Sequence, residues 1–477
     1  MLLPDHKTKI VCTIGPASSS EEVLRGLIHS GMNVARLNFS HGNLEGHREV
    51  IHKIRKLAFE LDAVVSIMAD LPGPKIRIGK LSEDPIHLKK GDKIILTTED
   101  MEGSGSIIPV NYSRLPESIR PGSPVYLNDG FIQLNCLGVF DKRVECEVVI
   151  GGPLSSNKGM NLPGSKILLE PVTDRDLDIV DFALNEGVDT FSVSFIEKAD
   201  DIQKIRNHAK NRGKSVFIVS KIEREEAVKN IDEILGVTDG LMIARGDLGV
   251  EIPIQKVPVV QKELIHKANL LSIPVITATQ MLESMTENIR PTRAEVTDVA
   301  NAILDGTDTV MLSGETAAGK YPVETASMMA KIARETESWR SKNKNKTDTV
   351  IKDIDNIKMD VDDVISLQVN DALLKLPIKY VITPTVSGET SRHISRFKSD
   401  TWILAFSRYL KTSRNLALSY GVYPIYIESK TDNWENIAVE KLKQWEMARK
   451  GDFIILTQGQ SPGKPGGTNL LKIISIT

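Results

Sequence analysis

Eight short apolar runs recur along the chain, each with a polar end, and this repetition constrains the fold more than any other feature. Near-continuous apolar runs are typical of parallel strands that helices bury on both faces. Segments with helical periodicity, such as residues 43–61 and 257–271, lie between most of the runs. Eight such units predict a closed (β/α)8 TIM barrel, with a doubly wound sheet as the alternative. The runs are residues 9–15, 32–40, 64–70, 190–196, 216–223, 240–247, 274–280 and 309–316.

A long stretch with little helical periodicity interrupts the repeat between its third and fourth runs. Residues 74–157 contain Gly, Pro and Asp clusters that separate short β-like runs. This composition predicts a small all-β domain inserted into the barrel. Its removal leaves residues 1–73 and 158–340 for the barrel, close to the roughly 250 residues typical of that fold. The β-like runs are residues 93–98, 124–127, 132–136 and 144–150.

The C-terminal part of the chain forms a further unit. Residues 341–355 are charged and polar, which is typical of a linker. Beyond them, four apolar runs (380–383, 402–407, 422–427 and 452–457) alternate with helical segments. This alternation predicts a second, smaller α/β domain over residues 341–477.

The composition excludes several classes of function. Sixty Lys and Arg residues against 63 Asp and Glu residues give a formal net charge of −3, so no global field favours nucleic acid or a membrane. Aromatic residues are 5% of the chain, too few for a base-stacking surface. Three scattered cysteines, Cys12, Cys136 and Cys146, predict neither a disulfide scaffold nor a zinc site. With no membrane helix or signal peptide in the pattern, we expect a cytoplasmic protein.

Polar side chains gather where the apolar runs end. In a (β/α)8 barrel the chemistry lies at the C-terminal ends of the strands, because the loops there converge over the barrel mouth. Side chains at positions i and i+2 of a strand share a face, so we expect Lys221 and Glu223 to project together. A buried ion pair would explain any one of these residues, but not all of them at one end of one barrel. The set is Arg36, Asn38, Ser40, Asp70, Lys221, Glu223, Arg245, Asp247, Thr279, Ser313 and Glu315.

These residue types suit a phosphorylated small molecule that also bears a carboxylate. Glu223 and Asp247, on adjacent strands, offer hard oxygen ligands to one divalent ion such as Mg²⁺. Lys221 offers a point charge for a phosphate or enolate oxygen, or an amine for a Schiff base. Arg36 can grip a phosphate with two N–H groups. Gly246 lets backbone N–H groups approach a carboxylate at the start of a helix.

Residues 314–320 (GETAAGK) match the outline of a P-loop that follows a strand. A P-loop needs a Ser or Thr hydroxyl after its lysine to bind Mg²⁺, and Tyr321 stands at that position. We therefore assign no P-loop.

Several longer motifs resemble those of pyruvate kinase. They include MNVARLNFSHG (32–42), SKIEREEA (220–227), MIARGDLGVEIP (242–253) and TATQMLESM (277–285). The likeness covers nearly the whole chain in the same order, including KTKIVCTIGPASS (7–19), residues 290–316 and GTNLLKI (467–473). It implies a glycolytic phosphotransferase that moves the phosphoryl group of phosphoenolpyruvate to ADP, giving pyruvate and ATP.

The resemblance also implies a role for each residue around the substrate. Glu223 and Asp247 would hold the catalytic Mg²⁺, which Mn²⁺ can replace. Lys221 would counter the charge on the transferring phosphoryl group and the enolate, Arg36 would hold the phosphate, and Thr279 would lie near the proton-delivery route. The substrate-binding residues would be Arg36, Lys221, Gly246, Asp247 and Thr279.

In the same resemblance the inserted β domain is a lid that closes over the nucleotide. Asp129 would help to hold the closed state. ADP or ATP would contact Asn38, Phe39, Ser40, His41, Arg77 and Lys158.

One departure from the family pattern concerns K⁺. Many pyruvate kinases hold K⁺ with residues that match Asn38, Ser40, Asp70 and the carbonyl of Leu71, and they carry a glutamate where this sequence has Lys75. A lysine ammonium can take the place of the monovalent ion. We therefore expect activity that does not require K⁺.

The C-terminal domain resembles the allosteric domain of the family. Residues 383–392 (TPTVSGETSR) resemble its phosphate-binding loop, although a plain turn is the alternative and Glu389 would repel an anionic effector. The resemblance further implies a homotetramer, with residues 293–304 at the interface between barrels. The effector-loop residues would be Thr385, Ser387, Gly388, Thr390, Ser391 and Arg392.

Two other functions stay open at this point. A metal-dependent aldolase or mutase that acts on pyruvate or phosphoenolpyruvate also uses a Glu/Asp pair and a cation, but the lid and the effector domain argue against it. The second alternative is a sensor of phosphorylated metabolites on a degenerate barrel, and the intact set Lys221, Glu223, Asp247 and Thr279 argues against that.

Overall fold

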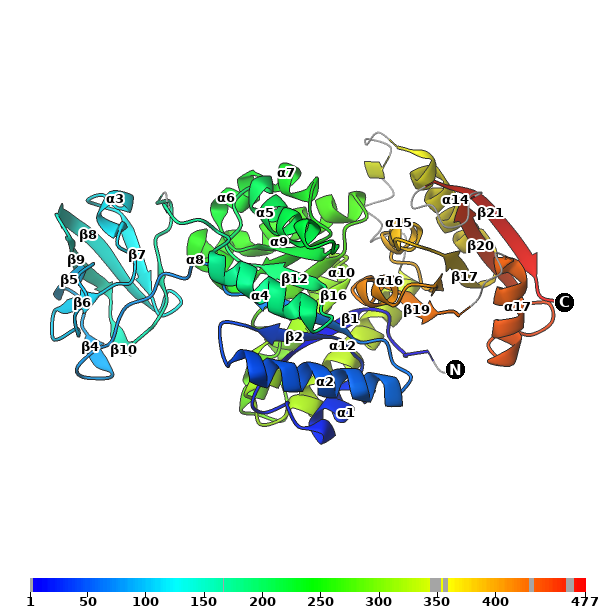
Figure 1. Cartoon of the computed structure of the whole chain (residues 1–477), viewed down its shortest axis with the longest axis horizontal. Coiled ribbons are helices and arrows are strands. Elements are labelled where there is room, and N and C mark those ends of the chain that lie inside the picture. The colour runs from blue at the N-terminus through cyan, green and yellow to red at the C-terminus, as the bar shows by residue number, and fades with distance from the viewer. Residues whose placement is uncertain (1–2, 166, 344–352, 355–358, 429–432, 460–466) are drawn as a thin grey trace.

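Three domains lie in a row along the long axis of the molecule (Figure 1). The structure, a computed structural model, describes residues 3–165, 167–343, 353–354, 359–428, 433–459 and 467–477. A barrel occupies the middle, with the inserted β domain at one end and the C-terminal domain at the other (Figure 1). Most of the expected linker, residues 344–352 and 355, lies outside the described residues.

The middle domain is a closed barrel of eight parallel strands, as the repeat predicted, so the doubly wound alternative was wrong. The order around the barrel, β1-β2-β3-β12-β13-β14-β15-β16 and back to β1, follows the sequence once the inserted strands are set aside. The strands are β1 (Lys9–Ile14), β2 (Met32–Asn38), β3 (Ser66–Leu71), β12 (Thr190–Val193), β13 (Phe217–Ile222), β14 (Gly240–Ala244), β15 (Val275–Ala278) and β16 (Thr309–Leu312).

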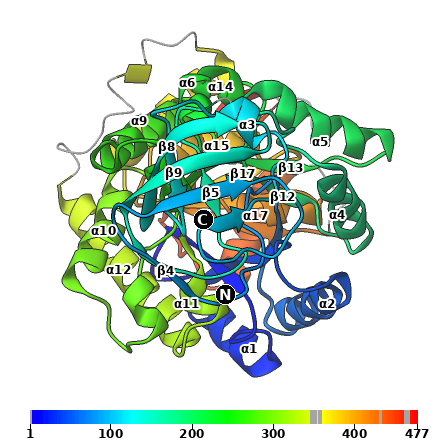
Figure 2. The ribbon, with the colours of Figure 1, turned by 90° about the vertical axis from the view of Figure 1, so that its left-hand side faces the viewer.

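Helices form a ring around these strands, with the β domain in front of the barrel in the end-on view (Figure 2). The predicted helix start at Thr292 is confirmed, because its side chain and that of Glu295 form a capping box. The helices are α1 (Glu21–His29), α2 (Leu44–Glu60), α4 (Asp174–Asn185), α5 (Ala199–Asn211), α6 (Glu225–Lys229), α7 (Ile231–Leu235), α8 (Arg245–Glu251), α9 (Val257–Leu270), α10 (Arg293–Leu304), α11 (Gly314–Ala317) and α12 (Pro322–Lys342).

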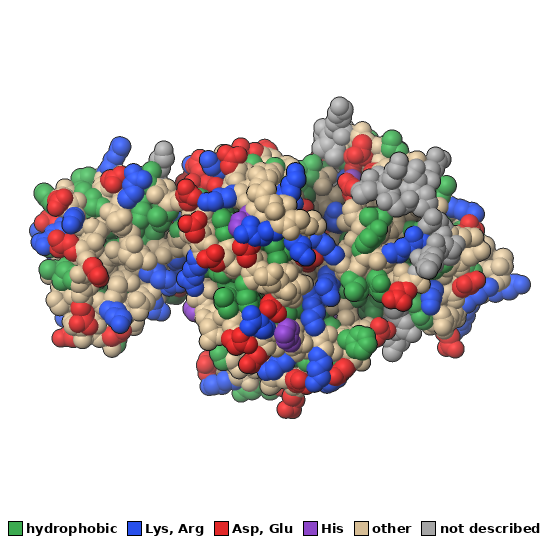
Figure 3. All heavy atoms as spheres, viewed as in Figure 1, with side chains coloured by type: hydrophobic (Ala, Val, Ile, Leu, Met, Phe, Trp, Pro, Cys, Tyr) green, Lys and Arg blue, Asp and Glu red, His purple; other side chains and the backbone are tan. Residues whose placement is uncertain are grey.

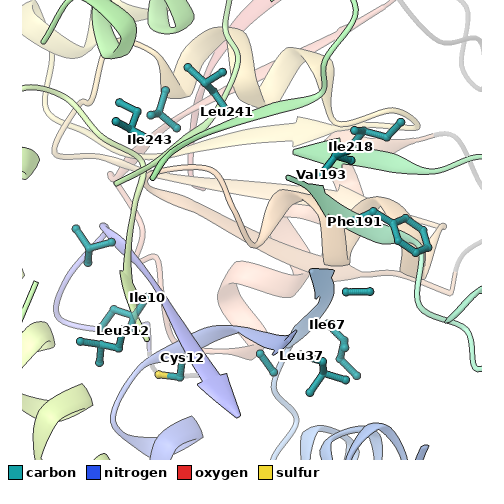
Figure 4. Packing of buried hydrophobic residues seen from close by; sticks show 14 of the residues in the cluster. Ile10, Cys12, Leu37, Ile67, Phe191, Val193, Ile218, Leu241, Ile243 and Leu312 are labelled. Atoms are coloured by element: carbon teal, nitrogen blue, oxygen red, sulfur yellow. The ribbon is translucent and has the colours of Figure 1, made fainter. Parts of the chain in front are cut away.

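Alternate residues of most barrel strands enter two separate apolar clusters. Ile218 and Leu241 belong to the cluster between strands and helices, part of which Figure 4 shows. Val219 and Met242, one residue further along, belong to the cluster inside the barrel. The alternation fixes which side chains can reach the mouth of the barrel, because every second residue of a strand faces inward.

The inserted domain has its own core, built on a six-stranded sheet in the order β11-β7-β8-β9-β5-β6 and a two-stranded sheet, β10-β4. Cys136 and Cys146 stand opposite each other on β8 and β9, both buried and both free thiols. The strand of this sheet that comes last in the chain, β11, lies a few residues beyond residue 157, the predicted end of the inserted domain. The elements are β4 (Ile86–Leu88), β5 (Lys93–Thr97), β6 (Ile107–Pro109), α3 (Leu115–Ser118), β7 (Pro124–Leu127), β8 (Ile132–Phe140), β9 (Arg143–Ile150), β10 (Gly152–Leu154) and β11 (Met160–Asn161).

The C-terminal domain is a five-stranded sheet in the order β19-β18-β17-β20-β21, and helices pack against it. All four predicted runs form parallel strands, and the antiparallel edge strand β21 was not among them. The elements are α14 (Val361–Lys375), β17 (Ile378–Pro384), α15 (Glu389–Ser395), β18 (Trp402–Ser407), α16 (Leu410–Leu416), β19 (Val422–Tyr426), α17 (Trp434–Gln444), β20 (Phe453–Gly459) and β21 (Thr468–Ser475).

The C-terminal domain closes the end of the barrel that lies opposite the β domain. Leu418 joins the apolar cluster inside the barrel, and its carbonyl accepts a hydrogen bond from the Thr309 hydroxyl at 2.8 Å. Asp308 accepts hydrogen bonds from the backbone N–H groups of Tyr420 (2.9 Å) and Val275 (3.1 Å) and lies 2.7 Å from the buried Lys398 ammonium. The junction therefore depends on a buried charge pair.

Acidic and basic side chains are mixed over the visible face of the molecule (Figure 3), in keeping with the net charge of −3. Among the described residues, no helix is both long enough and apolar enough to cross a membrane.

The junction yields a stability prediction. Asp308→Ala leaves the Lys398 ammonium buried without its partner, so we expect a loss of about 3–5 kcal/mol of stability. Urea unfolding and calorimetry check this. Glu60→Ala, which removes only the half-exposed ion pair with Arg25, is the control and should cost about 1 kcal/mol or less. Equal losses in the two variants would contradict the role given to Asp308.

Candidate active site

The inward-facing row of side chains on β13 ends in two charged residues at the C-terminal end of the strand. Phe217 and Val219 point into the barrel, so Lys221 and Glu223, the next two residues of that row, project at its C-terminal mouth. The same rule brings Asp70 to the mouth from β3, because Met68 faces inward. Lys221 and Glu223 therefore project together at the barrel mouth, as their i and i+2 spacing predicted.

Lys221 lies at the centre of the cluster. Its ammonium is 2.8 Å from Glu223 Oε1 and 3.4 Å from Asp70 Oδ1, and it donates to the Ser194 hydroxyl at 2.7 Å. That hydroxyl donates in turn to the carbonyl of Leu71 at 2.8 Å. Burial lowers the pKa of Lys221, but the charges of Asp70 and Glu223 outweigh it and raise the pKa above its ordinary value. The ammonium is therefore charged and fixed in direction.

Asp70 is the anion on which both cations converge. Arg36 donates through Nε at 2.9 Å and through a second guanidinium nitrogen to the same oxygen, and Ser192 donates to the other oxygen at 2.6 Å. Burial raises the pKa of Asp70, but Arg36, Lys221 and the Ser192 hydroxyl together hold it below its usual value. Arg36 also donates to the Thr13 hydroxyl at 2.9 Å, so its position is set by three strands.

Glu223 is buried, with 1% of its side chain exposed. Its second oxygen accepts the backbone N–H of Phe195 at 2.8 Å, and Phe195 holds a positive φ of 56°. Burial and the like charge of Asp247 raise the pKa of Glu223, and Lys221 opposes that rise. Two neighbouring carboxylates that repel each other favour a shared cation.

Asp247 lies in the first turn of α8, directly after β14, and 28% of its side chain is exposed. The Lys75 ammonium, from the segment that leads into the β domain, is 3.7 Å from its Oδ1. The residue thus faces the opening between barrel and β domain.

Thr279 lies on the next strand end and has a positive φ of 69°. Its hydroxyl accepts the backbone N–H of Gly246 at 2.8 Å and donates to the carbonyl of Ala278 at 2.6 Å. Arg245 donates to the Thr279 carbonyl at 2.8 Å and so supports this strained turn. Gly246, Asp247 and Thr279 therefore lie side by side on neighbouring strand ends, as the sequence predicted.

Comparisons with known proteins agree with this geometry. Residues 5–326 match the family model described as pyruvate kinase, barrel domain, and residues 363–474 match that described as pyruvate kinase, alpha/beta domain. The chain belongs to the pyruvate kinase family.

Similar proteins match this chain over nearly its whole length. The chain is 48% identical to the pyruvate kinase of Thermococcus litoralis, over all of both chains. It is 44% identical to that of Staphylococcus saprophyticus, over 98% of this chain and 80% of the relative. A solved pyruvate kinase from Cryptosporidium parvum superposes with a TM-score of 0.92 at 38% identity, over 99% of this chain and 97% of the other. The predicted family and fold class are thereby confirmed, and this chain is an enzyme of the phosphotransferase class.

The residues that the pyruvate kinase resemblance links to the nucleotide lie in two places. Asn38, Phe39, Ser40 and His41 form one loop at the end of β2, where Phe39 is buried and His41 is exposed. Arg77 and Lys158 lie together at the base of the β domain, where Arg77 donates to the carbonyl next to Lys158. In the described part of the chain, the two groups lie on separate elements, one on the barrel and one on the β domain.

The expected effector loop follows β17 and leads into α15. Several of its polar groups already bind within the domain: the Thr385 hydroxyl accepts the Gly388 N–H at 2.8 Å, and Thr390 pairs with Thr468 at 2.6 Å. Arg392 is half-buried and donates to the Ser387 carbonyl at 3.2 Å, and desolvation lowers its pKa.

The GETAAGK segment is not arranged as a phosphate loop. Glu315 is buried and accepts the backbone N–H groups of Ser313 (2.6 Å) and Leu282 (3.2 Å). Lys320 is exposed and pairs with Glu287 at 2.5 Å.

Three groups of the site were not predicted from the sequence: the Ser192 hydroxyl, the Ser194 hydroxyl and the Phe195 N–H. Ser192 on β12 and Ser194 directly after it face the barrel interior. Their period-2 spacing within the buried run TFSVSF is the feature from which both could have been predicted. No local pattern marks the N–H of Phe195.

Ser194→Ala removes the hydroxyl that directs the Lys221 ammonium. Because a hydrogen bond to a charged group contributes about 1.5–3 kcal/mol, we expect phosphotransferase activity to fall by about tenfold or more. Initial rates check this. The control, Thr190→Val, removes a hydroxyl at the other end of the same strand, where it faces Asn415, and should leave the rate within about twofold. An equal loss in both variants would show that the strand, not the hydroxyl, matters.

Proposed function

We propose that this chain transfers the phosphoryl group of phosphoenolpyruvate to ADP, giving pyruvate and ATP. The observation that carries the proposal is the network in which Lys221 joins Asp70 and Glu223 at the barrel mouth, beside Asp247 and Thr279. Membership of the pyruvate kinase family supports the same reaction. Phosphoryl transfer depends mainly on positioning and on countering charge, which is what this network supplies.

The chain's own cations act on the substrate. Lys221, held on one side by two carboxylates, directs its charge to the phosphoryl group in transit and to the enolate oxygen that it leaves. Arg36 has a planar guanidinium anchored through Asp70, and it receives the phosphate oxygens. The Gly246 N–H and the Thr279 hydroxyl would receive the substrate carboxylate in exchange for the hydrogen bonds that they now make with each other and with the Ala278 carbonyl. Thr279 would also lie near the route by which a proton reaches the enolate carbon.

Glu223 and Asp247 would hold a divalent ion, Mg²⁺ or in its place Mn²⁺. Their mutual repulsion fits a shared cation, and Mg²⁺ typically takes one or two carboxylates and leaves its other positions to water and substrate. Among the described residues, no group of three or more His, Cys, Asp or Glu side chains could hold a metal ion, so water and substrate would have to supply the remaining ligands. When bound, the ion would neutralise charge on the phosphoryl oxygens.

The β domain would act as a lid that excludes water from the transferring phosphoryl group. Its contacts with the barrel support this role: Asn161 donates to Glu251 at 3.4 Å, and Lys75 pairs with Asp247. ADP would then lie between the loop of residues 38–41 and the lid residues Arg77 and Lys158. Asp129, at the β7–β8 turn, would help to hold the closed lid.

We further propose that no monovalent ion is needed. The oxygens that would bind K⁺ already have partners, because Asp70 is neutralised by Arg36 and Lys221, and the Leu71 carbonyl accepts from Ser194. The Asn38 side-chain oxygen accepts the Ser40 N–H at 3.1 Å. Lys75 adds a fixed positive charge at the mouth.

The family resemblance favours a homotetramer with α10 at the interface between barrels. A phosphorylated effector at Thr385, Ser387, Gly388, Thr390, Ser391 and Arg392 would have to replace the hydrogen bonds that these residues now make within the domain.

A coupled assay with phosphoenolpyruvate and ADP tests the function. Lys221→Ala removes the central charge, and we expect the rate of pyruvate formation to fall by about 10²–10³-fold or more. Chelation of divalent ions should abolish activity, and added Mg²⁺ should restore it. Pyruvate production that needs no ADP and yields no ATP would favour the aldolase or mutase alternative. An undiminished rate in Lys221→Ala would refute the mechanism.

Lys75 gives a separate test of the K⁺ proposal. In a buffer whose only monovalent cation is tetramethylammonium, the unaltered chain should turn over at a rate that KCl does not change. Lys75→Glu replaces the fixed cation by an anion, so its rate should be low in that buffer and should rise on addition of KCl. Lys75→Ala separates loss of the cation from gain of the anion. An unaltered chain that works only with K⁺ would overturn this part of the proposal.

A further inference from the structure

His47 lies in the first turn of α2 and faces back toward the loop that leaves β2. Its ring stacks on that of Phe39, with centroids 4.2 Å apart and an interplanar angle of 29°. Phe39 is 4% exposed and packs edge-on against Phe182 at 6.0 Å. The imidazole thus rests on an aromatic ring that the barrel itself holds in place.

The same imidazole also binds the backbone of the loop. Nε2 of His47 is 2.9 Å from the carbonyl oxygen of His41, and because a carbonyl can only accept, Nε2 carries the proton. Burial lowers the pKa of His47, so the neutral ring with one N–H donor is favoured at neutral pH. Gly42, next to the bonded carbonyl, has a positive φ of 75°, and a Cβ there would approach Nε2 to 3.4 Å.

The loop is also held by backbone hydrogen bonds, among them one to β3 from the Phe39 N–H to the Asp70 carbonyl at 3.1 Å. Asn38 accepts the N–H of Ser40 at 3.1 Å through its side chain and that of His41 at 3.2 Å through its carbonyl. Asn43 caps α2 by accepting the Gly46 N–H at 2.8 Å. His47 alone among these residues connects the body of the helix to the exposed part of the loop.

We propose that His47 is a positioning residue for the nucleotide, which fixes the Asn38–His41 loop through the Phe39 ring and the His41 carbonyl without contacting ADP. The inference rests on the proposed function, in which this loop binds ADP. No other natural side chain supplies both a planar ring for Phe39 and an N–H at this distance from the carbonyl in the same small volume. The substitution His47→Phe would keep the stacked ring and lose the N–H donor, whereas His47→Gln would keep an N–H donor and lose the ring.

Steady-state kinetics of His47→Ala, His47→Phe and His47→Gln test the proposal, with ADP and phosphoenolpyruvate varied separately. Loss of one such hydrogen bond corresponds to roughly a threefold to tenfold change, so we expect KM for ADP to rise by about that factor in His47→Phe and further in His47→Ala. KM for phosphoenolpyruvate should stay within about twofold in all three. His52→Ala is the matched control, because His52 lies on the same helix, is mostly exposed and pairs with Glu186, away from the Asn38–His41 loop.

Thermal unfolding of each variant identifies any that does not fold, and the remaining substitutions then decide the result. An unchanged KM for ADP in the folded variants overturns the inference, and so does an equal rise in both KM values, which would indicate a purely structural role. An unaltered chain that forms no ATP refutes the proposed function instead. In that case calorimetric titration with ADP and Mg²⁺ still tests whether His47 supports nucleotide binding.

Discussion

The Lys221 ammonium, held between the buried carboxylates of Asp70 and Glu223, is the interaction on which the rest of the site depends. Isolated charges at this depth would be too costly to bury, and removing one partner of such a set typically costs about 3–5 kcal/mol. The barrel meets that requirement because its parallel strands bring residues distant in sequence to one rim. Ser194 completes the arrangement by fixing the direction of the ammonium.

The charges at the mouth are balanced before any substrate arrives. Two cations, Arg36 and Lys221, face two anions, Asp70 and Glu223, while Lys75 lies near Asp247. A phosphorylated carboxylate and a nucleoside diphosphate would both add negative charge to this neutral site. A divalent ion shared by Glu223 and Asp247 would restore the balance. The geometry therefore favours metal-assisted phosphoryl transfer over Schiff-base chemistry. Lys221 is also unsuited to the latter, because its raised pKa keeps the amine protonated.

Much of this arrangement follows from the sequence, and the exceptions have physical reasons. The alternation of inward and outward residues places Lys221, Glu223 and Asp70 once the strands are known, because the period of a strand is two. The same rule applies to Ser192 and Ser194. A hydroxyl in a buried strand carries no charge, however, and so does not by itself indicate a functional site. The Phe195 N–H and the pairing of Lys75 with Asp247 depend on backbone torsion and domain placement, which no local pattern encodes.

Strand β12 serves two purposes at its two ends. On β12, Ser192 and Ser194 support the charged cluster, while Thr190 at the other end faces the C-terminal domain. On β16, Thr309 and the preceding Asp308 bind that domain in the same way. A strand of about six residues spans only about 20 Å, so the site and the domain junction share one rigid element. Substitutions that only remove a hydrogen bond at one end should nevertheless separate catalysis from domain stability, because sites this far apart contribute almost independently.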